Sequence, residues 1–142
     1  MNKKFYLALA SLTFALLLSA CAGNKILDAP DTLPGDQLKK DYMVGNWCTN
    51  RELTGQTNKD AGHSALSNTR PLYWSFKQDG SWQVSTSGWL YENNGKWRLK
   101  GLNTMVLERS EGKPMNYQAS FKDSDLYLKD DEEKFLVLSE CE

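Results

Sequence analysis

The chain has 142 residues, of which 40% are hydrophobic and 25% are charged, and its 17 basic and 18 acidic residues give a formal charge of −1. A chain of this length supports one folded domain. Because proteins that bind nucleic acid carry an excess of basic residues, the near-balanced charge argues against a nucleic-acid partner.

The first residues are typical of an export signal. Lys3 and Lys4 precede an apolar stretch over residues 5–18. This stretch is shorter than the roughly 20 residues needed to span a bilayer, so it predicts a cleavable secretory signal. It ends in LSAC, residues 18–21, which resembles the lipobox of bacterial lipoproteins.

The resemblance implies that Cys21 carries acyl chains such as palmitate and that residues 1–20 are removed. Loss of Lys3 and Lys4 would change the formal charge from −1 to −3. Two or more acyl chains anchor a protein stably to a membrane. Gram-negative lipoproteins kept at the inner membrane commonly carry Asp after the lipidated cysteine. Ala22 stands there, which favours the outer membrane with the domain facing the periplasm. An ordinary secretory signal with an incidental Cys21 is the alternative.

The chain has three cysteines. If Cys21 is lipidated, Cys48 and Cys141 remain, and in an oxidising compartment we expect them to form a disulfide. The bridge would close a loop of about 94 residues, for which the chain-entropy model gives about 4.6 kcal/mol of stabilisation. The alternative is two separate thiols with catalytic or metal-binding roles.

Residues 21–41 are expected to be the lipidated cysteine and a flexible tether, because residues 22–35 are polar, contain Pro30 and Pro34 and show no periodicity. Residues 36–41 are expected to contain one helical turn. From residue 42 to 142 the pattern predicts a single β domain. Strands are expected near 43–52, 71–78, 81–87, 89–93, 96–100, 103–109, 115–122, 125–129 and 134–140.

Turn sequences separate these segments. Asp79-Gly80 and Asn94-Gly95 supply the positive backbone φ of tight hairpins. Eight or nine short strands with short connections predict an all-β fold, a small eight-stranded antiparallel up-and-down barrel, since closure removes exposed strand edges. A bridge between the first and last strands fits that closure.

Residues 53–70 interrupt the strand rhythm. The segment is polar and too long for a hairpin turn, and we interpret it as a loop over the ligand site. No stretch of the domain holds an apolar period of 3.6 residues, so no helix longer than a turn is expected.

Four motifs in order resemble small bacterial lipocalin-like domains: Gly45-Asn46-Trp47, Phe76-Lys77-Gln78-Asp79-Gly80, Gly95-Lys96-Trp97 and Leu126-Tyr127-Leu128. The resemblance covers residues 42–140 and implies an eight-stranded barrel with the Gly45–Trp47 strand at its closed end. A barrel of this size either fills with side chains or holds one small ligand.

The sequence does not predict an enzyme. His63 is the only histidine, and its neighbours Asp60 and Ser64 lack the separately held base and nucleophile of a triad. A zinc site needs three or four ligands. The acidic run over residues 130–133 lacks the spacing of a calcium loop. We therefore expect no catalytic residues, no cofactor and no metal.

The expected function is binding. The ligand would be a small apolar or amphipathic molecule buried in a concave site. Its predicted contacts are aromatic: Trp74, Phe76, Trp82, Trp89 and Tyr91. The alternative is a periplasmic protein-binding module, resembling inhibitors of lysozyme or an accessory subunit of an envelope complex.

Overall fold

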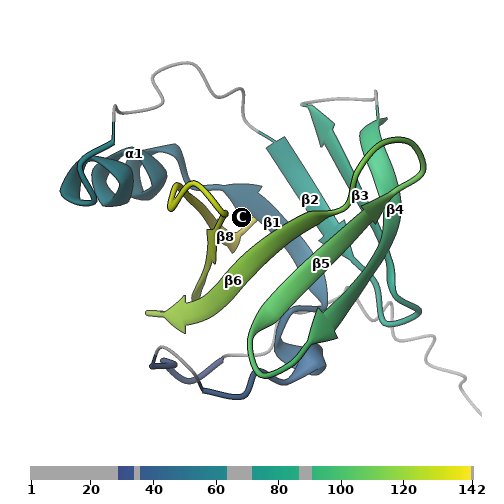
Figure 1. Cartoon of the computed structure of the whole chain (residues 1–142), viewed down its shortest axis with the longest axis horizontal. Coiled ribbons are helices and arrows are strands. Elements are labelled where there is room, and N and C mark those ends of the chain that lie inside the picture. Colours follow the sequence, from purple (N-terminus) through teal and green to yellow (C-terminus); the bar gives the residue numbers. More distant parts are fainter. Residues whose placement is uncertain (1–28, 34–35, 64–71, 87–90, 142) are drawn as a thin grey trace, which may run out of the picture.

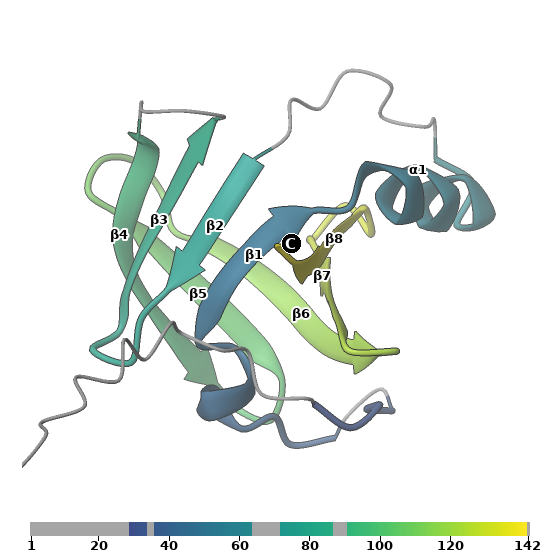
Figure 2. The same ribbon diagram turned by 180° about the vertical axis from the view of Figure 1, so that it is seen from behind.

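The computed structural model describes residues 29–33, 36–63, 72–86 and 91–141. Its elements in chain order are the 3₁₀ helix η1 (Lys40–Tyr42), β1 (Gly45–Thr49), α1 (Arg51–Asp60), β2 (Leu72–Phe76), β3 (Ser81–Thr86), β4 (Tyr91–Lys100), β5 (Thr104–Arg109), β6 (Met115–Lys122), β7 (Asp125–Lys129) and β8 (Phe135–Glu140). Each strand pairs antiparallel with the next, and β8 pairs with β1 (Figures 1 and 2). The predicted eight-stranded up-and-down barrel is confirmed. No helix of the described residues is both long and apolar enough to span a membrane.

One predicted turn is wrong. The expected strands 89–93 and 96–100 are a single strand, β4, which passes through Asn94-Gly95 without reversing. Gly95 pairs with Trp82 on β3 and with Arg109 on β5. A Cβ at Gly95 would lie 1.8 Å from the backbone oxygen of Glu108. The glycine is therefore required by a close approach of β5 and not by a hairpin.

Residues 29–33 and 36–43 cross one end of the barrel, beneath the strands in Figures 1 and 2. Backbone hydrogen bonds tie them to the barrel: Thr32 N donates to Phe121 O at 2.9 Å, and Leu38 N donates to Leu102 O at 2.8 Å. Leu38 is buried, and Met43 is fully buried. The part of the predicted tether that the structure describes therefore belongs to the barrel. The helical turn expected within 36–41 is found slightly later, as η1.

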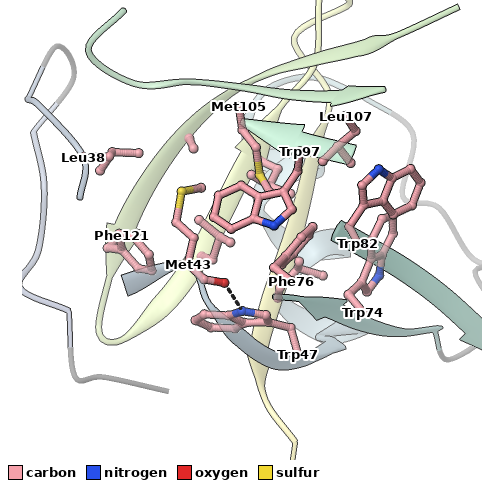
Figure 3. Packing of buried hydrophobic residues seen from close by; sticks show 14 of the residues in the cluster. Leu38, Met43, Trp47, Trp74, Phe76, Trp82, Trp97, Met105, Leu107 and Phe121 are labelled. Carbon is pink, nitrogen blue, oxygen red and sulfur yellow. Dashed lines mark hydrogen bonds between the residues drawn. The ribbon is translucent and has the colours of Figure 1, made fainter. Parts of the chain in front are cut away.

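Aromatic side chains fill the interior above this closed end (Figure 3). Trp47 is fully buried, and its Nε1 donates to Met43 O at 3.0 Å. Trp97 Nε1 donates to Lys77 O at 3.0 Å, and the Trp97 ring meets Phe76 edge-on at 5.7 Å between centroids. A buried indole needs such an acceptor for its N–H group. Trp47 accordingly lies at the closed end, as the sequence motif implied.

Closure of the barrel depends on a short strand pair. The register of β1 with β8 runs only from Trp47↔Glu140 to Thr49↔Leu138. The predicted disulfide between Cys48 and Cys141 is confirmed, and it joins β1 to the residue that follows β8. The bridge therefore reinforces the pair at which the sheet meets itself.

The expectations of a long loop and of no helix longer than a turn are also wrong, because α1 occupies residues 51–60 (Figure 1). Asn50 caps the helix, since its Oδ1 accepts from Leu53 N at 2.9 Å. The buried residues of α1 are polar, Thr54 and Asn58. An apolar 3.6-residue period was therefore the wrong signal for this helix.

Thr54 and Asn58 hydrogen-bond to the edge of β8 that β1 leaves uncovered. Thr54 Oγ1 accepts from Val137 N at 3.0 Å. Asn58 Oδ1 accepts from Phe135 N at 2.7 Å, and its Nδ2 donates to Phe135 O at 2.9 Å. Four helical residues rise about 6 Å, close to the roughly 6.7 Å spanned by two strand residues. The helix thus satisfies a strand edge that would otherwise be open.

Replacing Asn58 by alanine is expected to lower the free energy of unfolding by about 2–4 kcal/mol, because two backbone groups of Phe135 lose their partner. Urea unfolding measures the loss, and faster hydrogen exchange at the Phe135 amide locates it. Thr57→Ala on the same helix is the control, with a change of about 0.5 kcal/mol or less. Equal losses in both variants would contradict this account of the helix.

Candidate functional site

The candidate site lies at the end of the barrel opposite residues 29–43. The even-numbered strands begin there. Four side chains at this end, Leu72, Met115, Tyr117 and Leu136, are only half-buried, yet they pack against the core cluster. The next inward residues, such as Trp74, Ala119 and Leu138, are buried. We call these four residues the mouth. Burial increases inward from the mouth, as expected of a concave apolar site.

Arg109 stands at the edge of the mouth. Met105 and Leu107 on β5 are fully buried, so strand alternation directs Arg109 to the same inner face at the open end. Its guanidinium donates to Met115 Sδ, and the Tyr117 hydroxyl donates to the same sulfur at 3.5 Å. Among the described residues, Arg109 belongs to no ion pair, whereas Arg98 on the outer wall pairs with Glu108 at 3.1 Å. The mouth therefore combines an apolar surface with a cation that forms no ion pair among the described residues.

A pocket of about 280 Å³ lies beside these residues, lined by Pro114, Met115, Asn116, Tyr117, Asp130, Asp131 and Glu132. Burial raises the pKa of Tyr117, and the Asp130 carboxylate raises it further, while Arg109 lowers it. Tyr117 is therefore a neutral hydrogen-bond donor at ordinary pH. Asp130 Oδ1 already accepts from the backbone N–H groups of Glu132 and Lys134, both at 2.9 Å.

Three of the predicted ligand contacts lie together below the mouth. The rings of Trp74 and Trp82 stack with centroids 6.1 Å apart, and Trp74 also stacks on Phe76 at 6.3 Å (Figure 3). Trp74 is 6% exposed, Trp82 2% and Phe76 0%. Trp74 Nε1 donates to Thr49 Oγ1 at 3.2 Å. In this structure the three rings are packed in the core and are not among the residues that line the 280 Å³ pocket, and Trp74 has the largest exposed fraction of the three.

Other predicted sites are not placed by the structure. Trp89, the lipidation site Cys21 and residues 64–70 lie outside the described residues. Tyr91 is the first residue of β4, but its side chain is also outside them. Within the described ranges, His, Cys, Asp and Glu side chains form no group of three that could hold a metal.

Arg109, Met115 and Tyr117 were not predicted as site residues. Two alternating sets in the sequence contain the signal: Met105/Leu107/Arg109 on β5 and Tyr117/Ala119/Phe121 on β6. Each set begins or ends with a polar or amphipathic residue at the same end of the barrel. The arginine is informative only once the pairing Leu107↔Met115 shows that it continues an inward face.

An eight-stranded closed barrel is an architecture that can hold one small ligand among its inner side chains. The mouth and Arg109 give this barrel an apolar surface and polar groups at one end. No protein-family model, no curated protein and no solved structure matches this chain.

Proposed function

We propose that this protein is an envelope lipoprotein, anchored through Cys21, whose barrel binds a small amphipathic molecule at the mouth without catalysing a reaction. The observation that carries the binding proposal is the guanidinium of Arg109, which contacts the half-buried Met115 and pairs with no carboxylate in the part of the chain that the structure describes. The ligand's apolar part would cover the mouth, and its polar head would approach Arg109 and Tyr117.

Physical reasoning favours a negatively charged head. An apolar contact contributes about 25 cal/mol for each Å² removed from water. Because this contribution has no direction, the mouth would hold the ligand but would not orient it. A carboxylate can form charge-assisted hydrogen bonds with Arg109, and these are stronger than bonds between neutral groups. Asp130 stands on the other side of the pocket. Asp131 and Glu132 line the pocket as well, and these carboxylates would repel an anionic head, so its place would be on the Arg109 side.

The anchor and the location are supported by separate features. The lipobox-like residues 18–21 support lipidation, and the disulfide supports an oxidising compartment such as the periplasm. Residue Ala22 supports the outer membrane in a Gram-negative host. Attachment to a bilayer would hold the barrel close to lipids, which are one source of amphipathic molecules.

The test compares two ligands that differ only in the head group, octanoate and 1-octanol. The chain of residues 22–142, which lacks both the apolar segment 5–18 and the acylation site, is used so that no detergent is needed. Arg109→Gln is expected to weaken octanoate binding about tenfold, corresponding to about 1.4 kcal/mol, and to leave octanol binding unchanged. Isothermal titration calorimetry measures both affinities. Arg98→Gln is the matched control, because Arg98 lies on the outer wall.

Equal weakening of both ligands by Arg109→Gln would contradict the assigned role of the guanidinium. Failure of both ligands to bind the parent chain would contradict the binding site itself. Native mass spectrometry of protein purified from its own envelope then addresses the alternative. A bare mass with a co-purifying protein would favour a protein-binding module, whereas a small-molecule adduct would favour ligand carriage.

A further inference from the structure

The outer wall formed by β1, β2 and β3 differs in chemistry from the rest of the barrel surface. The strand register places Asn46, Ser75 and Gln83 in one row across these strands. Cys48, Tyr73 and Ser85 form the neighbouring row. Both rows face outward, because the alternating residues Trp47, Trp74 and Val84 are buried.

These rows surround a hollow of about 320 Å³. It is lined by Asn46, Tyr73, Trp74, Ser75, Gln83, Ser85 and Cys141. Tyr73 is 43% exposed, one of the three large hydrophobic side chains that the described residues expose. The small side chains of Ser75 and Ser85 beside it leave its ring accessible. Tyr73 and Ser75 lie on the outer face of β2, so the hollow opens on the outside of the barrel, and buried Trp74 between them also contributes to its lining.

The polar side chains that line the hollow are uncharged. Within the described residues, no side-chain hydrogen bond is formed by Asn46, Tyr73, Ser75, Gln83 or Ser85. Some amides elsewhere are engaged: Asn50 donates to Ser139 Oγ, and Gln78 donates to Asp41. Five polar groups in one hollow therefore remain available to a ligand.

The opposite wall is charged. Its outward positions include Lys96, Arg98, Glu108, Lys122, Asp125 and Lys129. In a chain with 25% charged residues, a lining without a single charge is a clear local difference. A phosphate, carboxylate or polybasic ligand would find no opposite charge there. A neutral ligand with many hydroxyl groups would lose no ionic hydration and would meet hydrogen-bonding groups.

We propose that the hollow around Tyr73 binds a neutral oligosaccharide. The apolar C–H face of a sugar ring would lie on the exposed Tyr73 ring, which offers a flat, amphipathic contact surface. The side-chain amides of Asn46 and Gln83 provide both donors and acceptors for sugar hydroxyls, and the serines provide further ones. The site is separate from the mouth, so the proposal does not depend on the amphipathic ligand.

The test uses two soluble neutral trisaccharides, maltotriose and N,N′,N″-triacetylchitotriose. Each is titrated into the ¹⁵N-labelled chain of residues 22–142 and followed by amide chemical shifts. At least one is expected to bind with millimolar affinity and to shift the amides of Asn46, Ser75 and Gln83. Tyr73→Ala is expected to weaken that binding at least tenfold. Tyr127→Ala, which removes a tyrosine from β7 on the opposite wall, should have no effect.

The proposal is overturned if neither trisaccharide shifts these amides at 10 mM, if the shifts gather at the mouth, or if Tyr73→Ala leaves the affinity unchanged. A well-dispersed spectrum of Tyr73→Ala shows that the variant is folded. Gln83→Ala provides a second variant on a different strand, with an expected loss of about threefold for each hydrogen bond removed. Saturation by octanoate should leave the trisaccharide affinity unchanged, which separates this site from the mouth.

Discussion

Replacement of Gly95 by alanine is expected to prevent stable folding of the barrel. The added Cβ would lie 1.8 Å from the Glu108 backbone oxygen and 2.9 Å from its carbonyl carbon. Neither atom can move aside as the end of a flexible side chain could, so β4 and β5 would have to separate. Trp82 Nε1 also donates to the Glu108 oxygen, at 3.2 Å, and that bond would be strained as well. The expected loss is at least about 3 kcal/mol.

The same substitution elsewhere gives a matched control. A Cβ at Gly55, within α1, meets no atom within 4 Å. Gly55→Ala should therefore raise the free energy of unfolding by about 0.5–1 kcal/mol, since alanine favours helix. Urea unfolding monitored by tryptophan fluorescence compares the two variants. Wild-type stability in Gly95→Ala would show that β5 does not approach β4 as closely as described.

Removal of the disulfide is the second large expected effect. The double substitution Cys48→Ala/Cys141→Ala should lower the free energy of unfolding by about 4–5 kcal/mol, because the bridge closes a long loop, with a sequence separation of 93 residues. The loss should appear first at the short β1–β8 pair. The amide hydrogens of residues 48 and 138 should exchange faster in the variant than in the parent, and hydrogen-exchange measurements on both proteins would detect that opening.

Reduction provides the internal comparison. Dithiothreitol should lower the stability of the parent chain to that of the double variant and leave the double variant unchanged. A double variant as stable as the oxidised parent would mean that the strand pairing alone closes the barrel. Both measurements use urea, so that the same unfolding transition is compared.

The strands were predictable because the alternation of inward and outward residues is a local pattern. The disulfide was predictable from the number of cysteines. Inward alternation is visible in sets such as Leu126/Leu128, and the pairing of Cys48 with Cys141 followed once Cys21 was assigned to lipid. The β4 error had a different cause. Asn94-Gly95 has turn chemistry, but the glycine is needed because Glu108 on another strand comes close. That approach is a tertiary contact between β4 and β5, and no local sequence pattern reveals it.

The helix and the mouth were missed for related reasons. The buried face of α1 consists of Thr54 and Asn58, whose role depends on an unpaired edge of β8 far along the chain. Arginine is usually an exposed surface residue, so Arg109 gave no signal of its own. Only the register of β5 with β6 places it beside Met115. Hydrophobic periodicity identifies the faces of helices and strands that become buried in the core. It does not locate polar side chains that are needed by a distant backbone.

The contacts of α1 also bear on how the chain folds. A ten-residue helix is marginal on its own in water, and this one is fixed by Phe135 and Val137, at separations of 77 and 83 residues. Its stabilising partners exist only when β8 is in place beside β1. Helix formation and barrel closure should therefore be one cooperative event late in folding, with the helical signal reporting that the two ends of the sheet have met.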